Sequence, residues 1–265
     1  MLRKIGRDRN ETAEHDMRWS GLFRGAQAAD GANAMSSASQ DDRKREAALA
    51  ASALVEDGMI VGLGTGSTAR FLVSILGERV RQGLHIIAIP TSEATRIQAL
   101  SEGITVVGFA EQQRIDVTID GADEMAGKGL DLIKGGGGAL LREKIVAAAS
   151  DKMVVICDSS KLVPRLGGGF PLPVEIVPFG WEVTINKLRG RSRKVTLRTG
   201  KDGGPFLTDG GHYIIDCDLD PVDDPGALER DLAKIVGVVE VGLFIGIAKE
   251  AFVAGPDGIL HLIAE

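Results

Sequence analysis

The repeated succession of a short apolar strand, a turn and a helix is the feature that most constrains this chain. Residues 59–61 form an apolar strand that runs into the glycine-rich turn 62–66, and Ser67 and Thr68 open a helix that continues to about Leu76. Further strands are expected at 85–89, 105–107 and 115–119, with a helix at 91–100. Because continuous apolar strands alternate with helices, we expect a parallel sheet covered by helices on both faces, a Rossmann-like α/β fold.

The pattern extends in both directions before it changes in kind. A helix-forming stretch near 47–55 stops at Gly58, and a helix at 139–149 leads to the buried-type strand 153–157. Residues 167–179 are rich in glycine and proline and indicate a crossing segment or an edge strand, since proline cannot serve a central ladder. A helix at 183–188, strands at 194–198 and 213–217 and a helix at 227–235 then predict a small α+β module of ferredoxin-like type.

Strands at 238–244 and 259–263 are expected to return to the first sheet. The predicted organisation is therefore a main α/β catalytic domain over 41–166 and 241–265, a small α+β domain over 167–240, and a leader over 1–40. The stretch 25–40 is too poor in large apolar residues to order itself, so we interpret the leader as disordered or over-annotated, with Met35 as an alternative start.

Composition narrows the function classes. A formal net charge of -6 and a pI of about 5.4 argue against a nucleic-acid-binding surface, and no apolar run reaches the roughly 18 residues of a membrane span. Cys157 and Cys217 have no metal-ligand spacing and form no CxxC pair, so neither a metal site nor a disulfide framework is predicted. The leader lacks the apolar core of a targeting segment, which favours a cytoplasmic protein.

The turn Gly62-Leu63-Gly64-Thr65-Gly66-Ser67-Thr68 is a candidate anion site. Backbone N–H groups and the positive end of a helix dipole would face a phosphate or carboxylate there, and the hydroxyls of Thr65, Ser67 and Thr68 add donors. The dinucleotide and Walker patterns both fail, because Ser67 replaces the third glycine and no lysine follows. A tight turn between strand and helix remains the alternative interpretation.

Two further segments carry candidate polar groups. The stretch Asp120-Gly121-Ala122-Asp123-Glu124 follows the strand 115–119 at its carboxyl end, where open α/β sheets bind ligands, although these acids could equally cap the next element. Lys134 precedes four glycines, whose N–H groups can approach a ligand closely; the alternative is a surface lysine before a flexible loop.

Glu143 lies on the helix after the glycine run, between Val146 and Ala147 on the helical wheel, so it borders an apolar face. Partial burial would raise its pKa and make it a better proton acceptor near neutral pH. Helix geometry alone favours an ordinary first-turn glutamate.

Lys161 follows the strand 153–157 and is either a ligand-binding lysine or a surface one.

The motifs GLGTGST at 62–68, DGADE at 120–124, KGGGGALLREK at 134–144, DSSK at 158–161 and FPLPVEIVP at 170–178 together resemble ribose-5-phosphate isomerase of type A. The order and spacing agree, and the resemblance runs from about Asp41 to the C-terminus, including GVVEVGLF at 237–244. One departure is Gly138, where the family commonly has alanine.

The resemblance implies metal-free, cofactor-free interconversion of ribose 5-phosphate and ribulose 5-phosphate through an enediolate, in the non-oxidative pentose phosphate pathway. It implies Glu143 as the general base, with Asp120, Asp123 and Lys134 as further catalytic groups, and a homodimer or homotetramer. The implied substrate-binding residues are Thr65, Gly66, Ser67, Thr68, Asp120, Gly121, Ala122, Asp123, Lys134, Gly135, Gly136, Gly137 and Lys161. Lys44, on the first helix, is implied as a possible phosphate contact.

Two other functions fit the same scaffold. A different sugar-phosphate isomerase or a lactonase could use the fold, since fold does not fix function. A sugar-phosphate-sensing regulator would need a basic DNA-reading module, and the leader is short and charge-balanced. The presence of Glu143 with Lys134 and both aspartates favours catalysis.

Overall fold

A computed structural model describes residues 39–265, beginning with helix α2 (Gln40–Ser52). Ser39 caps this helix: its hydroxyl accepts a hydrogen bond from the Asp42 N–H, and the Asp42 carboxylate accepts one from the Ser39 N–H. Ser39 and Gln40 thus belong to the folded chain, although the predicted leader, 1–40, included them. The rest of the leader, with Met35, lies outside the described residues.

Helix α2 ends at Ser52, well before Gly58, where we expected it to stop. The last carbonyls explain the early end. The Arg79 guanidinium donates hydrogen bonds to the carbonyl oxygens of Ser52 and Val55, and residues 53–55 form a tighter turn. A basic side chain that satisfies terminal carbonyls ends a helix without glycine.

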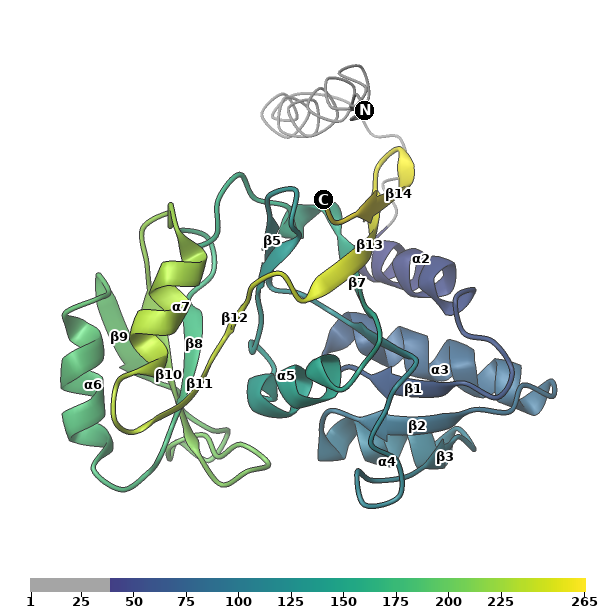
Figure 1. The fold of residues 1–265 in the computed structure, drawn as a ribbon, viewed down its shortest axis with the longest axis horizontal. Helices are drawn as coiled ribbons and strands as arrows, with labels where there is room; N and C mark the ends of the chain where they lie inside the picture. Colours follow the sequence, from purple (N-terminus) through teal and green to yellow (C-terminus); the bar gives the residue numbers. More distant parts are fainter. Residues whose placement is uncertain (1–38) are drawn as a thin grey trace, which may run out of the picture. The chain divides into compact units, whose positions relative to one another are not determined.

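The large sheet has seven strands in the order β14-β13-β7-β4-β1-β2-β3 (Figure 1). Its members are β1 (Ile60–Leu63), β2 (Ile87–Pro90), β3 (Thr105–Val106), β4 (Val117–Asp120), β7 (Met153–Asp158), β13 (Ala248–Gly255) and β14 (Gly258–Ile263). All neighbours pair in parallel except β13 and β14. The predicted Rossmann-like sheet is confirmed.

Helices cover both faces of this sheet. The core on one face joins α2, α3 (Ser67–Arg81) and α4 (Glu93–Ser101) to alternate strand residues such as Val61 and Leu63. On the other face, Val146 of α5 (Leu140–Ala148) packs against Ile89 and Ile115. Successive side chains of β1 point to opposite faces of the sheet, and each face packs against a different set of helices.

The chain changes direction across the sheet at β1. From β1 it proceeds through α3, β2 and α4 to β3 on one side, and then returns to β4 on the other side of β1. The carboxyl ends of β1 and β4 therefore lie side by side, with Leu63 paired to Ile119. Open α/β sheets bind ligands at such a switch point.

The small sheet is antiparallel, in the order β11-β8-β10-β9. Its elements follow one another as β8 (Leu172–Ile176), α6 (Trp181–Arg189), β9 (Lys194–Leu197), β10 (Tyr213–Asp218), α7 (Pro225–Ala233) and β11 (Val238–Val241). This is the predicted ferredoxin-like arrangement. Leu172, Val174 and Ile176 share a core with the inner sides of both helices, so the opposite face of the sheet is left for other contacts.

A third, three-stranded sheet, β12-β6-β5, consists of β5 (Glu124–Ala126), β6 (Asp131–Ile133) and β12 (Leu243–Phe244). Our expectation of one strand at 238–244 returning to the large sheet was wrong. The segment splits at Gly242, where an added Cβ would lie 2.3 Å from the Lys134 carbonyl oxygen and 2.8 Å from that of Pro173. The strand that returns to the large sheet is β13.

Residues 167–179 were expected to form a crossing segment or an edge strand, yet they contain β8, which is an interior strand. Pro173 is tolerated because its carbonyl oxygen accepts a hydrogen bond from the Gly242 N–H, which shows that its nitrogen also faces that side. Pairing with β11 ends at Val174, so no donor is missing from the ladder. A proline can therefore stand in an interior strand where its nitrogen is not needed as a donor to the neighbouring strand.

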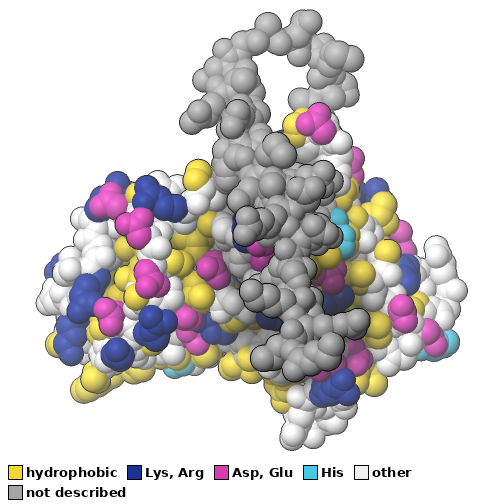
Figure 2. All heavy atoms as spheres, turned by 45° about the horizontal axis from the view of Figure 1, so that its top comes forward, with side chains coloured by type: hydrophobic (Ala, Val, Ile, Leu, Met, Phe, Trp, Pro, Cys, Tyr) yellow, Lys and Arg dark blue, Asp and Glu magenta, His cyan; other side chains and the backbone are white. Residues whose placement is uncertain are grey.

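Two surface findings bear on partners. No helix in the described range is long and apolar enough to cross a membrane. On the visible part of the face shown in Figure 2, Lys and Arg side chains lie among Asp and Glu side chains and do not form one basic patch.

Close approach of β1 and β4 makes Gly64 sensitive to substitution. A Cβ there would lie 2.0 Å from Asp120 Oδ1 and 2.6 Å from the Asp120 Cα. Gly64→Ala is expected to lower the free energy of unfolding by about 1–3 kcal/mol, as overpacking does, measured by chemical denaturation. Gly121→Ala is the matched control, since its Cβ would meet nothing nearer than 3.9 Å. Equal stability of the two variants would contradict the packing assignment.

Candidate active site

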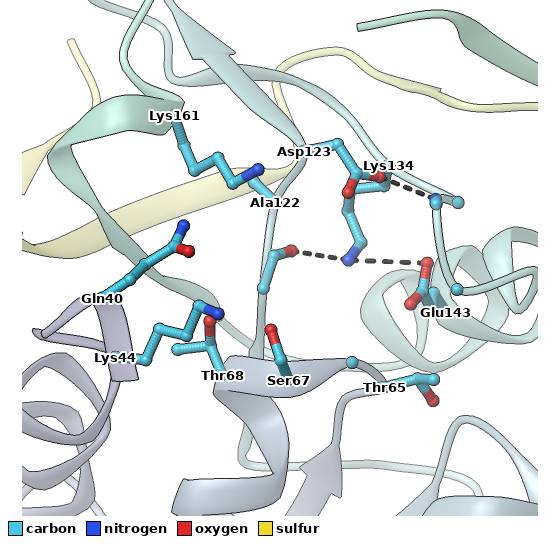
Figure 3. Close-up of a pocket in the computed structure, with 15 residues that line it drawn as sticks. Gln40, Lys44, Thr65, Ser67, Thr68, Ala122, Asp123, Lys134, Glu143 and Lys161 are labelled. Carbon is cyan, nitrogen blue, oxygen red and sulfur yellow. Dashed lines mark hydrogen bonds and ion pairs between the residues drawn. The ribbon is translucent and has the colours of Figure 1, made fainter. Parts of the chain in front are cut away.

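A pocket of about 120 Å³ opens at the carboxyl ends of β1 and β4 (Figure 3). Its walls come from α2, the turn after β1, the segment after β4, the glycine loop after β6, α5 and the turn after β7. The lining residues are Gln40, Lys44, Thr65, Gly66, Ser67, Thr68, Gly121, Ala122, Asp123, Lys134, Gly135, Gly136, Gly137, Glu143 and Lys161. Segments far apart in sequence thus converge at the switch point of the sheet.

The glycine turn presents its backbone to the pocket, while the Thr65 side chain has another task. Thr65 Oγ1 lies 2.7 Å from Thr91 Oγ1 and 2.8 Å from Ser92 Oγ, inside a buried cluster of hydroxyls. The hydroxyl expected to bind an anion therefore fixes the turn. Ser67 and Thr68 begin α3, where first-turn N–H groups have no partner within the helix and no side chain caps them.

Lys134 is the centre of the polar contacts at one end of the pocket. Its Nζ donates a hydrogen bond to the Gly121 carbonyl oxygen at 2.6 Å, and lies 2.9 Å from Asp120 Oδ2 and 3.5 Å from Glu143 Oε2. The side chain is 3% exposed. Burial lowers the pKa of Lys134, but the carboxylates of Asp120 and Glu143 outweigh it and raise that pKa, so the ammonium stays charged.

Asp120 lies behind Lys134 and does not line the pocket. Its Oδ1 accepts hydrogen bonds from the N–H groups of Thr65 at 3.0 Å and Gly121 at 2.7 Å, and the residue is fully buried. Burial raises the pKa of Asp120, against the opposing effects of Lys134 and the two amide donors. The geometry makes Asp120 the buried counter-ion that holds Lys134 in place.

Glu143 faces the pocket from α5 with unusually little stabilisation for a carboxylate. It is 3% exposed, and its Oε2 is buried without a hydrogen bond. Burial raises the pKa of Glu143 to about 8; Lys134 opposes this rise, and Asp120 and Asp123 add to it. A carboxyl group with a pKa near the working pH can both accept and return a proton.

Asp123 is held by the glycine loop. The Gly136 N–H donates a hydrogen bond to Asp123 Oδ2 at 2.7 Å, and Gly136 leaves no room for a side chain because a Cβ would lie 2.7 Å from Asp123 Oδ1. In Figure 3 the Asp123 carboxylate lies beside the Lys134 side chain, at the same end of the pocket as Glu143. Two carboxyl groups and one ammonium therefore share this end.

The other end of the pocket is cationic. In Figure 3 the Lys44 side chain from α2 ends beside Thr68, and the Lys161 side chain from the short helix η1 (Ser159–Lys161) ends near Ala122. Lys44 is 13% exposed, and Lys161 Nζ lies 5.9 Å from the centre of the Phe170 ring. Two ammonium groups that line the pocket, one of them beside the start of α3, suit a dianionic group.

The structure brings together every residue proposed from the sequence except Asp120, which lies one layer deeper. It also adds Gln40, whose amide donates to Asp158 Oδ2 at 3.4 Å. Gln40 was overlooked because the leader was drawn through residue 40; the Ser39-x-x-Asp42 capping box was the available signal. Within residues 39–265, no group of three or more His, Cys, Asp and Glu side chains is arranged to hold a metal ion.

Comparison with known proteins identifies the family of this chain. A family model for ribose 5-phosphate isomerase A (phosphoriboisomerase A) matches residues 87–258. The ribose-5-phosphate isomerase A of Gloeobacter violaceus is 57% identical over 219 residues, covering 83% of this chain and 95% of that protein. The enzyme of the same name from Synechococcus sp. is 51% identical over 223 residues, covering 84% and 97% respectively.

Solved structures give the same result over most of the fold. Ribose 5-phosphate isomerase A from Methanocaldococcus jannaschii superposes with a TM-score of 0.81 at 40% identity, covering 85% of this chain and all of that one. A D-ribose-5-phosphate isomerase in complex with phospho-erythronic acid superposes with a TM-score of 0.83 at 37% identity, with the same coverage. The chain is therefore an isomerase that belongs to the ribose 5-phosphate isomerase A family.

Proposed function

We propose that this chain interconverts D-ribose 5-phosphate and D-ribulose 5-phosphate through an enediolate, with Glu143 as the general base. The observation that carries the proposal is a buried carboxyl group with a raised pKa, 3.5 Å from a buried lysine, in a pocket whose other end is cationic. Membership of the family supports the reaction, and the charges that line the pocket support a phosphate at one end and the reacting carbons at the other.

The phosphate belongs at the cationic end. Lys44 and Lys161 supply charge there, and the first turn of α3 supplies N–H donors and the hydroxyls of Ser67 and Thr68. A solved relative is described in complex with phospho-erythronic acid, a phosphorylated sugar acid, which supports a sugar phosphate as the ligand here. This placement directs C1 and C2 of the open-chain sugar toward Glu143 and Lys134.

The proton transfer uses one base in both directions. The Glu143 carboxylate removes the proton from C2 of the aldose, the electrons of that C–H bond form the C1–C2 double bond, and the C1 carbonyl oxygen becomes an enediolate oxygen. Lys134 stabilises the negative oxygen as it develops. Glu143 then delivers the same proton to C1. The proton on the O2 hydroxyl moves to O1, so that C2 becomes the carbonyl carbon of the ketose.

The two aspartates have different roles in this scheme. Asp123 lines the pocket at the reacting end, so we assign it the transfer of the proton between O2 and O1. Asp120 is buried behind Lys134 and does not line the pocket, so we assign it the orientation of Lys134 and not a direct contact with the sugar.

Removal of the base tests the proposal directly. Glu143→Gln preserves the shape of the side chain but cannot accept a proton, so kcat for ribose 5-phosphate should fall by at least about 100-fold with little change in KM. Formation of ribulose 5-phosphate is the measurement. Glu78→Gln, an exposed change on α3, is the matched control and should keep wild-type kcat. Wild-type turnover by the Glu143 variant would refute the assignment.

The raised pKa predicts the pH dependence of the rate. Glu143 must be ionised to remove the C2 proton, so kcat/KM should rise with pH and level off above an apparent pKa near 8. The profile is measured on the wild-type protein over pH 5–10. A rate already level from pH 5 upward would show that Glu143 ionises at its ordinary pKa, and would contradict the effect of burial.

The same shift has a consequence for stability. In the folded protein the carboxyl keeps its proton up to a pH of about 8, whereas its ordinary value is 4.5. The folded state therefore binds more protons between these values, and the stability present below pH 4.5 is lost progressively as pH rises from about 4.5 through 8. A glutamine at this position does not ionise, so Glu143→Gln should not lose stability in this way. The melting temperature of the variant minus that of the wild type should increase by about 2 °C or more between pH 5 and pH 9.

The cationic end is tested by its lysines. Lys161→Ala and Lys44→Ala each remove a charged partner of the phosphate and should raise KM by about tenfold or more, with a smaller effect on kcat. Lys187→Ala, an exposed lysine on α6, serves as the control and should leave KM unchanged. An unchanged KM in both pocket variants would place the phosphate elsewhere.

A further inference from the structure

We propose that Arg198 is a positioning residue that orients the N–H groups of Gly136 and Gly137, in the glycine loop 135–138, toward the reacting end of the pocket. The inference rests on the proposed function and adds a residue that lies outside the pocket lining. Arg198 directly follows β9 of the small sheet, and its Nη1 donates hydrogen bonds to the carbonyl oxygens of Gly135 at 2.9 Å and Gly136 at 3.2 Å.

Peptide geometry connects these carbonyls to the pocket. In a trans peptide the C=O and the following N–H point in opposite directions. The Gly135 carbonyl shares its peptide with the Gly136 N–H, which donates to Asp123 Oδ2 at 2.7 Å. The Gly136 carbonyl shares its peptide with the Gly137 N–H, and Gly137 lines the pocket. Arg198 therefore binds the far ends of two peptide groups whose near ends face the site.

The guanidinium is itself fixed from behind. Its Nε and Nη2 donate to the two carboxylate oxygens of Asp216 on β10, at 2.9 Å and 2.5 Å. The side chain of Arg198 is 15% exposed and that of Asp216 is 20% exposed. A bidentate pair of this kind holds the planar guanidinium in one orientation, which leaves Nη1 for the loop.

A glycine loop needs such an external contact. Each glycine populates many backbone conformations, so an unsupported run of four would present its N–H groups in no fixed direction. The segment that joins β9 to β10 adds a second contact: the Phe206 ring lies within 2.5 Å of the point where a Cβ on Gly138 would be. The absence of a side chain at Gly138 thus leaves the space that the Phe206 ring occupies.

The segment between β9 and β10 also contacts the helices α4 and α5, which cover the large sheet. Asp209 Oδ2 accepts a hydrogen bond from the Glu93 N–H at the start of α4 at 2.8 Å, and lies 3.4 Å from Arg142 Nη1. Arg142 precedes Glu143 on α5. The connection between β9 and β10 therefore contacts α4 and α5 through Asp209 as well as the glycine loop. Arg198 is the charged side chain through which it binds the backbone of that loop.

Kinetics of Arg198→Ala test the role. Misdirected N–H donors act on the developing charge more than on the bound phosphate, so we expect kcat for ribose 5-phosphate to fall by about 10- to 100-fold. The inhibition constant of inorganic phosphate, which probes the cationic end, should stay within about twofold of the wild-type value. Arg193→Ala is the control, because Arg193 is half-exposed and pairs with Asp220 at 3.4 Å, outside the pocket lining. It should retain wild-type kcat.

The outcomes separate the possibilities. A kcat of Arg198→Ala within about twofold of wild type, or a parallel loss of kcat and phosphate binding, would overturn the positioning role. If Arg198→Ala does not fold, Asp216→Ala decides, since it keeps the arginine but removes both oxygens that hold the guanidinium; an unchanged kcat would then refute the proposal. Wild-type protein that fails to convert ribose 5-phosphate would instead refute the proposed function itself.

Discussion

The interaction on which the site depends is that of the buried Lys134 ammonium with the oxygen atoms around it. Its three oxygen neighbours come from three places: Asp120 at the end of β4, the Gly121 carbonyl just after it, and Glu143 on α5. A buried charge is tolerated only where such partners replace water. The requirement fixes the distance between the large sheet and α5, and it also ties β6 to both.

Access to the pocket distinguishes two carboxyl groups that both lie close to Lys134. Burial raises the pKa of each of them. Asp120 accepts two backbone hydrogen bonds through Oδ1, and its Oδ2 lies 2.9 Å from the lysine, behind the pocket lining. Glu143 lines the pocket, and its pKa rises to about 8. Position relative to the pocket therefore separates the acid that we assign to holding Lys134 from the one that we assign to proton transfer.

Much of this could be predicted from the sequence because it depends on local pattern. Strand–turn–helix periodicity gave the parallel sheet, and its switch point at β1 and β4 follows from the order of the elements. Errors arose where tertiary contacts decide. Helix α2 ends early because Arg79, on α3, binds its last carbonyls. The predicted strand 238–244 divides at Gly242, which lies against the carbonyl oxygens of Lys134 and Pro173.

The site shows the same limit at the scale of single side chains. Helix geometry places Glu143 beside Val146 and Ala147, but the degree of burial and the distance to Lys134 come from the packing of α5 against the sheet. Arg198 carries no local signal at all, since its partners are carbonyl oxygens of a loop far back in the chain. A glycine run can be recognised as permissive from sequence; the side chain that makes it rigid is found only in the fold.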